Sequence, residues 1–150
     1  IFDRRPEADV MPFVKKNGMG IMAYGSLAHG LLTGVWTADK TFGDDDWRRS
    51  GANFGIKSWG PENLAANVAV VEKLKVIAAD HGKTIPQLAI AWVLANEAIS
   101  VALAGSVTPA EAKENLGGDW EMSDDLRQEI DTLVLAEGSG VGTSGMEIAT

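Results

Sequence analysis

Residues 21–34 of the chain have the sequence IMAYGSLAHGLLTG, which begins with a short apolar run and continues into small, flexible residues. The run Ile21–Tyr24 follows glycines and is typical of a buried strand. A second apolar run, Ile99–Ala104, predicts another buried strand. Because helical patterns lie between the two runs, we expect the strands to pair in parallel, with helices covering the sheet.

Helical signals account for most of the remaining chain. Leu64, Val68, Val71, Leu74 and Ile77 recur at the spacing of one helix face. Thr84 with Gln87, Thr108 with Glu111, and Ser123 have the form of helix N-terminal caps. The patterns predict helices over Pro6–Lys16, Glu62–Asp80, Ile85–Asn96, from Pro109 to about Gly117, and from Asp124 onward.

The length of the chain limits the fold that these elements can complete. Two parallel strands alone leave unpaired edges, which makes an isolated two-stranded sheet an unstable arrangement. A closed barrel of eight strands and eight helices needs about 250 residues, whereas this chain has 150 and begins with Ile1 rather than methionine. We therefore expect an α/β chain that forms part of a barrel and is cut from something longer.

Composition excludes several classes of function. The formal net charge of −8 argues against binding to nucleic acid or to an anionic membrane surface. The absence of cysteine excludes disulfides, thiol catalysis and zinc–thiolate sites, and it fits a cytoplasmic protein. The acidic run Asp44-Asp45-Asp46 lacks an EF-hand pattern, so we expect it to be solvated and predict no metal site.

An aperiodic stretch, residues 35–60, follows the first strand. It is rich in aromatic residues, which favours a lid over a disordered insertion. We expect Trp92 and Trp120 to be core residues, and His81 to cap a helix end. Whether Trp47 and Trp59 border a substrate pocket stays open.

Two segments carry the residues suited to ligand binding. Tyr24 ends a strand and offers a flat face for stacking, and the small residues after it let backbone N–H groups approach a phosphate. The segment Ala104–Glu111 runs from a strand end into a helix N-terminus, where free N–H groups and the helix dipole favour anions. For each segment alone, an ordinary structural turn or cap explains the residues about as well.

Several motifs along the chain are informative when their order and spacing are taken together. They are Asp3-Arg4-Arg5-x-Glu7, Ala23-Tyr24-x-x-Leu27-x-x-Gly30-x-Leu32-Thr33-Gly34, Asp46-Trp47-Arg48-Arg49, Gln87-Leu88-Ala89-Ile90-Ala91-Trp92-Val93-Leu94, Ala104-Gly105-Ser106 and Glu114-Asn115-Leu116-Gly117. With these motifs the chain resembles the C-terminal half of the aldo-keto reductase family. The resemblance implies a (β/α)8 TIM barrel that reduces carbonyl compounds with a nicotinamide cofactor. It assigns residues 1–137 to the cofactor-binding C-terminal part of the barrel and leaves 138–150 as a Gly- and Ser-rich tail.

The resemblance also implies roles for individual residues. Tyr24 matches the aromatic residue that stacks on the nicotinamide ring, and Arg48 in the lid would reach over the pyrophosphate. The family's catalytic Asp, Tyr, Lys and His have no counterpart here, so we assign no catalytic residue. The remaining implied cofactor contacts are Gly25, Ser26, Leu27, Ala28 and His29 at the pyrophosphate, Gly105, Ser106 and Val107 at the adenosine phosphate region, and Glu114 and Asn115 at the adenine. We expect the His29 side chain itself to be solvated.

One departure from the family bears on the choice of cofactor. Relatives often have a basic residue or serine where this chain has Val107, and Arg or Gln where it has Glu111. The resemblance implies NADP(H), but a carboxylate at position 111 would repel a 2′-phosphate and could bind ribose hydroxyls, which leaves NAD(H) possible. Alternatively, Glu111 only completes the cap that Thr108 begins.

The sequence thus predicts an oxidoreductase segment that supplies the cofactor site of a carbonyl reductase, with the rest of the barrel and a small carbonyl substrate as its partners. A non-catalytic cofactor-binding module is the alternative, including a half-barrel completed by another chain.

Overall fold

The computed structural model describes residues 1–50, 55 and 57–142. Phe54 of the predicted lid and residues 143–150 of the predicted tail lie outside the described residues, as do residues 51–53 and 56.

Two short strands form the centre of the structure. β1 (Ile21–Ala23) and β2 (Ile99–Ala102) pair in parallel, with Met22 opposite Val101 and Ala23 opposite Ala102. This confirms the parallel pairing that the two apolar runs predict. The strands are shorter than those runs because Tyr24, Leu103 and Ala104 already belong to the loops that leave the sheet.

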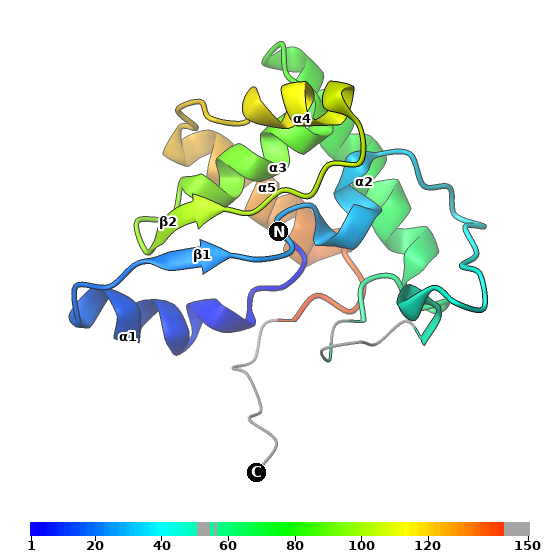
Figure 1. The fold of residues 1–150 in the computed structure, drawn as a ribbon, viewed down its shortest axis with the longest axis horizontal. Coiled ribbons are helices and arrows are strands. Elements are labelled where there is room, and N and C mark those ends of the chain that lie inside the picture. Colours follow the sequence, from blue (N-terminus) through cyan, green and yellow to red (C-terminus); the bar gives the residue numbers. More distant parts are fainter. Residues whose placement is uncertain (51–54, 56, 143–150) are drawn as a thin grey trace.

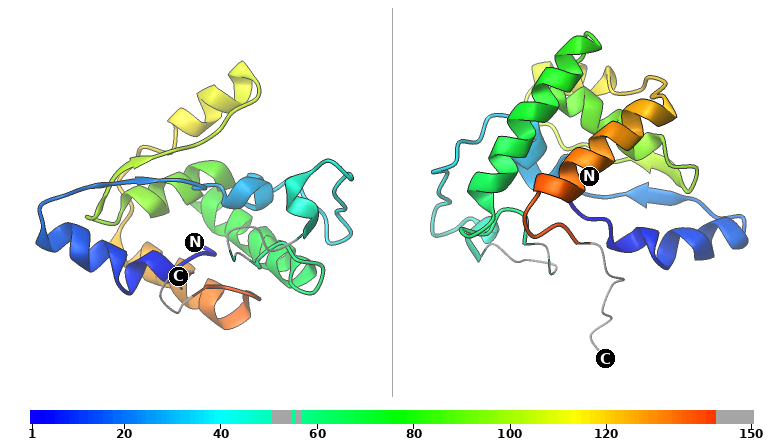
Figure 2. Two further views of the ribbon diagram at one scale, coloured as in Figure 1. Left: turned by 60° about the horizontal axis from the view of Figure 1, so that its bottom comes forward. Right: turned by 180° about the vertical axis from the view of Figure 1, so that it is seen from behind.

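Helices connect and cover the strands (Figure 1). Their bounds are α1 (Val10–Lys16), α2 (Leu64–Asp80), α3 (Ile85–Leu94), α4 (Pro109–Leu116) and α5 (Asp124–Glu137). In the left view of Figure 2, α1, α2, α3 and α5 lie on one side of the two strands, whereas α4 projects beyond the end of β2. None of the helices in the described part of the chain has the length and apolar character needed to cross a bilayer.

The predicted helix over Pro6–Lys16 is wrong in its first half. A 3-10 turn, η1 (Arg5–Glu7), comes first, and α1 begins only at Val10, where Asp9 accepts a hydrogen bond from the Val10 N–H at 2.6 Å. Pro12 then falls in the first turn of α1, where backbone N–H groups have no partner within the helix. A proline there costs no helical hydrogen bond, so the helix forms around it.

The predicted caps form at the other helices. Ser123 Oγ accepts a hydrogen bond from the Leu126 N–H at 3.2 Å, and Thr108 Oγ1 accepts one from the Glu111 N–H at 3.2 Å. The Thr84 N–H donates to Gln87 Oε1 at 3.1 Å at the start of α3. His81, at the end of α2, lies 2.9 Å from the Ile77 carbonyl through Nδ1, which agrees with the predicted capping role.

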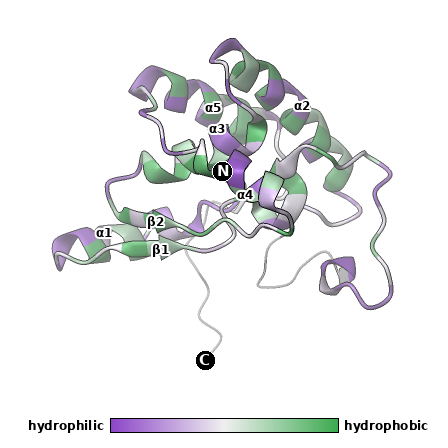
Figure 3. Ribbon diagram, turned by 45° about the horizontal axis from the view of Figure 1, so that its top comes forward, coloured by the Kyte–Doolittle hydropathy of each residue, from purple (hydrophilic) through white to green (hydrophobic). Residues whose placement is uncertain are grey.

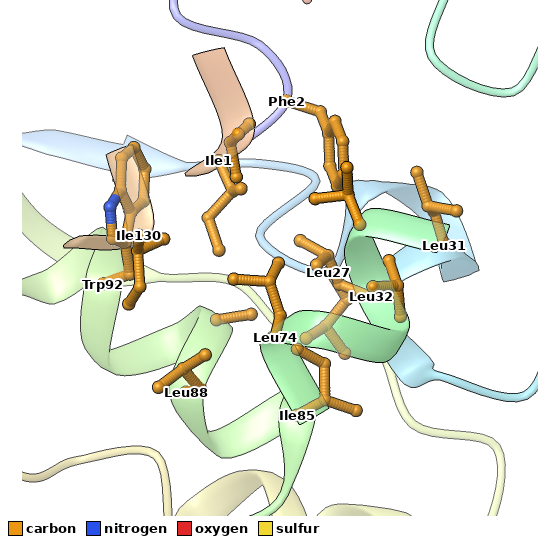
Figure 4. Close-up of a cluster of buried hydrophobic side chains, with 14 of the residues drawn as sticks. Ile1, Phe2, Leu27, Leu31, Leu32, Leu74, Ile85, Leu88, Trp92 and Ile130 are labelled. Carbon is orange, nitrogen blue, oxygen red and sulfur yellow. The ribbon is translucent and has the colours of Figure 1, made fainter. Parts of the chain in front are cut away.

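The hydrophobic core lies between the sheet and the helices (Figure 4). Leu74 of α2, Leu88 of α3 and Ile130 of α5 are fully buried there, and Phe2 packs with them. Trp92 is buried, as predicted, and its indole N–H donates to Asp131 Oδ1 at 2.9 Å.

The opposite side of the sheet is apolar but exposed. Met22 is 63% exposed, Val101 40% and Leu103 39%, and both strands are hydrophobic in Figure 3. Within the described residues, each strand has only the other as its partner. Such a two-stranded parallel sheet is consistent with part of an α/β barrel.

Residues 138–142 are attached to the body of the structure. Asn67, buried in α2, accepts a hydrogen bond from the Ser139 N–H at 2.8 Å and donates to the Ser139 carbonyl at 2.7 Å. The Arg4 N–H donates to the Gly142 carbonyl at 2.7 Å. The start of the Gly- and Ser-rich stretch is therefore held at two points.

Candidate functional site

A groove of about 890 Å³ opens where β1 and β2 end. It is large enough for a small-molecule ligand or cofactor, since such sites enclose roughly 300–1,000 Å³. The loops after both strands line it, which is the usual position for ligands in parallel α/β folds. The predicted contacts that meet in it are Tyr24, Gly25, Ser26, Leu27, His29, Arg48, Gly105, Ser106, Val107, Glu111, Glu114 and Asn115.

Ala28 is the one predicted contact that does not line the groove. It faces a separate cavity of about 200 Å³, also bordered by Trp59 and the N-terminal residues.

The turn after Tyr24 has an unusual backbone. Ala28 and His29 have φ angles of 47° and 54°, and Gly30 has 115°, so three residues in succession adopt left-handed conformations inside η2 (Ala28–Thr33). Such conformations cost energy in residues with a Cβ atom and tend to cluster at functional sites. Gly30 is required, because a Cβ atom there would lie 2.7 Å from the Trp36 ring.

Tyr24 directly precedes this turn. Its side chain is 74% exposed, and its ring meets the imidazole of His29 edge-on with 5.5 Å between centroids. An aromatic ring with this much exposed surface can stack on a planar ligand.

The sequence predicts a solvated side chain for His29, but in the structure this side chain is half-buried. Its imidazole packs at 5.1 Å from the rings of both Trp47 and Trp59, in addition to Tyr24. Burial among these rings, and then the positive charge of Arg48, lower the pKa of His29 below its usual 6.5. The prediction failed because the left-handed backbone and the distant tryptophans decide where the ring lies.

The two tryptophans that the sequence leaves open differ in their environment. Trp59 is a core residue with 2% exposure and also borders the smaller cavity, whereas Trp47 is 42% exposed. Their rings meet edge-on at 5.8 Å. The loop after η2 therefore folds back onto the turn that carries His29.

Arg48, in η3 (Trp47–Ser50), also connects this loop to the turn that carries His29. Its Nη1 donates to the His29 carbonyl at 3.0 Å, and its Nη2 forms an ion pair with Asp46 Oδ2 at 2.6 Å. Hydrogen bonds from Arg48 lower the pKa of Asp46 to about 2. The guanidinium also lies over the rings of Trp36 and Phe42. Arg48 thus reaches the groove with its orientation already set.

The far end of the groove is formed by the loop between β2 and α4. Asn115 Nδ2 donates to Ser106 Oγ at 3.0 Å, which joins the C-terminal part of α4 to the loop. A Cβ atom at Gly105 would meet nothing within 4 Å, so the backbone there is open to a ligand. Glu114 and Asn115 are both half-buried at this end.

Glu111 also has a definite position. Its Oε2 accepts a hydrogen bond from the Val107 N–H at 2.8 Å, and its own N–H donates to Thr108 Oγ1. The carboxylate therefore contributes to the cap, as the alternative interpretation of this residue expects, although through Val107 rather than the Thr108 N–H. It nevertheless lines the groove.

Sequence reasoning missed several residues that line the groove. Ala104 lies in the predicted segment Ala104–Glu111, but the sequence predicts no contact for it, and Leu103 directly precedes that segment, so extending it by one residue would have found Leu103. Trp36 and Pro86 gave no local signal, because they reach the groove from the lid and from the first turn of α3. The further lining residues are Gly30, Thr33 and Val35.

The sequence and the fold correspond to a known family. The model of the aldo/keto reductase family matches residues 1–134, and the chain belongs to this family. It is 33% identical over 136 residues to the aldo-keto reductase YhdN of Bacillus subtilis, covering 89% of this chain and 40% of that protein. The NADH-specific methylglyoxal reductase of Escherichia coli is 31% identical over 116 residues, covering 77% of this chain and 33% of that protein.

Solved structures agree with this assignment. The glycerol dehydrogenase of Gluconobacter oxydans superposes with a TM-score of 0.78 at 26% identity, covering 99% of this chain and 43% of the other. An aldo-keto reductase of Bacillus halodurans shares the fold, with a TM-score of 0.61 at 19% identity and coverage of 94% and 41%. The chain thus spans about 40% of the length of the relatives it matches.

Proposed function

We propose that the groove binds a nicotinamide dinucleotide, and that the full-length protein uses it to reduce a small aldehyde or ketone. The observation that carries this proposal is the continuity of one groove from the exposed ring of Tyr24 to the loop before α4. An extended ligand with a planar group at one end and a nucleoside at the other has the matching shape.

The lining residues suit the successive parts of such a ligand. The ring of Tyr24 would stack on the nicotinamide, and Arg48 and the turn Gly25–His29 would hold the pyrophosphate. Ser106 and Asn115 would contact the adenosine. The cofactor supplies a hydride when bound, and this chain's share is to bind and orient it.

Membership of the family supports the reductase activity. The relatives of this chain include an enzyme named for NADH and methylglyoxal and one from Schizosaccharomyces pombe named for NADP(+). Both names support a nicotinamide cofactor for the present protein, and the first supports a small carbonyl substrate.

The test is turnover by the full-length protein. We expect a panel of small aldehydes and ketones to oxidise NADH or NADPH, followed by absorbance. We expect the 150-residue chain alone to show no turnover, because the resemblance assigns the catalytic residues to a part of the barrel that precedes it. Absence of turnover with every carbonyl and both cofactors in the full-length protein would contradict the proposal.

The exposed apolar side of the sheet favours one rival. Met22, Val101 and Leu103 would be covered equally well by a second copy of the chain, which would make it a cofactor-binding half-barrel without chemistry. The oligomeric state of the 150-residue chain, measured by sedimentation, distinguishes this half-barrel from a segment of a longer enzyme. A folded dimer that binds cofactor without turnover supports the rival, whereas a monomer or aggregate supports a segment of a longer enzyme.

A further inference from the structure

The charged side chains that line the groove are unevenly distributed. Arg48 lies at the end near Tyr24, where it pairs with Asp46. Glu111 and Glu114 lie at the end formed by β2 and α4. Of the described residues that line the groove, Arg48 is the only lysine or arginine. Among the described lining residues, the end that would receive the adenosine therefore carries two carboxylates and no lysine or arginine.

The carboxylate of the exposed Glu111 is oriented toward the loop before α4 by one hydrogen bond. The Val107 N–H donates to its Oε2 at 2.8 Å, which places the carboxylate beside the residue that precedes the cap of α4. Free N–H groups and the helix dipole would otherwise make the first turn of α4 attractive to a phosphate. Here a carboxylate of the protein itself already lies beside this helix start, so an approaching anion is repelled by Glu111.

Lys113 does not compensate for this charge. It follows Glu111 by two residues on α4, which turns its side chain roughly 200° around the helix at 3.6 residues per turn. It is absent from the lining of the groove.

We propose, on the basis of the dinucleotide site above, that Glu111 makes this groove select NAD(H) over NADP(H). The two cofactors differ by one phosphate on the adenosine ribose. A carboxylate accepts hydrogen bonds from the free ribose hydroxyls of NAD(H), as acidic residues do in other dinucleotide sites. The same carboxylate disfavours the dianionic phosphate of NADP(H).

The experiment is a comparison of Kd values for NADH and NADPH on the full-length protein, measured by fluorescence titration without substrate. For the unmodified protein we expect NADH to bind at least tenfold more tightly. In Glu111→Gln the amide oxygen can still accept from the Val107 N–H while the charge is lost. This variant should therefore reduce the preference for NADH about tenfold, chiefly through tighter NADPH binding.

A matched control removes a carboxylate elsewhere. Glu129→Gln changes an exposed glutamate on α5 that does not line the groove, and it should leave both Kd values unchanged. Because the effect of Glu111 is electrostatic, raising the salt concentration should also narrow the difference between the two cofactors.

The outcomes separate this inference from the proposed function. If neither cofactor binds, the dinucleotide site itself is wrong. If the unmodified protein binds NADPH as tightly as NADH or more tightly, the site stands and the selectivity is overturned. An unchanged ratio in Glu111→Gln, with only a lower melting temperature, would show that Glu111 acts solely as a helix cap and would equally overturn it.

Discussion

Arg48 donates a hydrogen bond to the backbone carbonyl of His29 at 3.0 Å, across nineteen positions of the sequence. This bond joins the loop after η2 to the left-handed turn beside Tyr24. Since Asp46 pairs with the same guanidinium, the arginine is oriented before any ligand arrives. A pre-oriented cation binds an anion with little loss of side-chain entropy.

Replacing Arg48 with glutamine should weaken cofactor binding about tenfold, because a charge-assisted hydrogen bond is worth roughly 1.5–3 kcal/mol and part of it is screened here by Asp46. Fluorescence titration of the full-length variant checks this. Arg49→Gln is the control, since Arg49 is exposed and pairs with Asp44 outside the groove. Equal losses in the two variants would show that Arg48 has no particular role.

Tyr24 should act through its ring and not through its hydroxyl. We expect Tyr24→Phe to bind the cofactor nearly as well as the unmodified protein. Tyr24→Ala should lose affinity by a factor of about ten to one hundred, because stacking of a base on an aromatic side chain is worth roughly 1–3 kcal/mol. Measuring the Kd of the cofactor for both variants tests whether Tyr24 acts through its ring. A large loss in Tyr24→Phe would contradict a stacking role.

His29 should make the protein less stable in mild acid. Its folded pKa lies below the ordinary 6.5, so the unfolded chain binds the proton more readily. The stability from the neutral, half-buried ring is thus complete above an ordinary pKa of 6.5 and is lost as the pH falls toward the folded pKa. Melting temperatures at about pH 7.5 and about pH 5.5 should differ less in His29→Gln than in the unmodified protein. A difference of the same size would show that another group is responsible.

The core of α2 offers a matched pair for stability. Leu74 is fully buried and Val76, two residues later, is 61% exposed. Leu74→Ala should lower the free energy of unfolding by about 2–5 kcal/mol through lost burial and a residual cavity. Val76→Ala should change it by less than about 0.5 kcal/mol if this face of the helix is solvated. Urea unfolding measures both, and a large loss at Val76 would show that further parts of the protein cover it.

Local chemistry made part of this fold predictable. Ser123 and Thr108 cap their helices as expected, because a side-chain oxygen needs only the next turn of the chain to find its N–H partner. The parallel pairing of β1 with β2 follows from two apolar runs separated by helices. The same reasoning fails within residues 6–16, where Asp9 competes with Pro6 as the helix start.

Features that depend on distant contacts could not be predicted. The ring of His29 is buried by Trp47 and Trp59, which follow it by eighteen and thirty positions, and no local pattern marks the left-handed backbone at Ala28. The resemblance did predict that the loops after β1 and β2 line the same groove. The bond from Asn115 to Ser106 that joins them depends on the tertiary structure.

A crystal structure of the full-length protein with NADH tests the central claim most directly. It should place the nicotinamide against Tyr24, the pyrophosphate beside Arg48, and the adenosine between Ser106 and Asn115, with the ribose hydroxyls facing Glu111. A cofactor bound elsewhere while this groove stays empty would contradict the account.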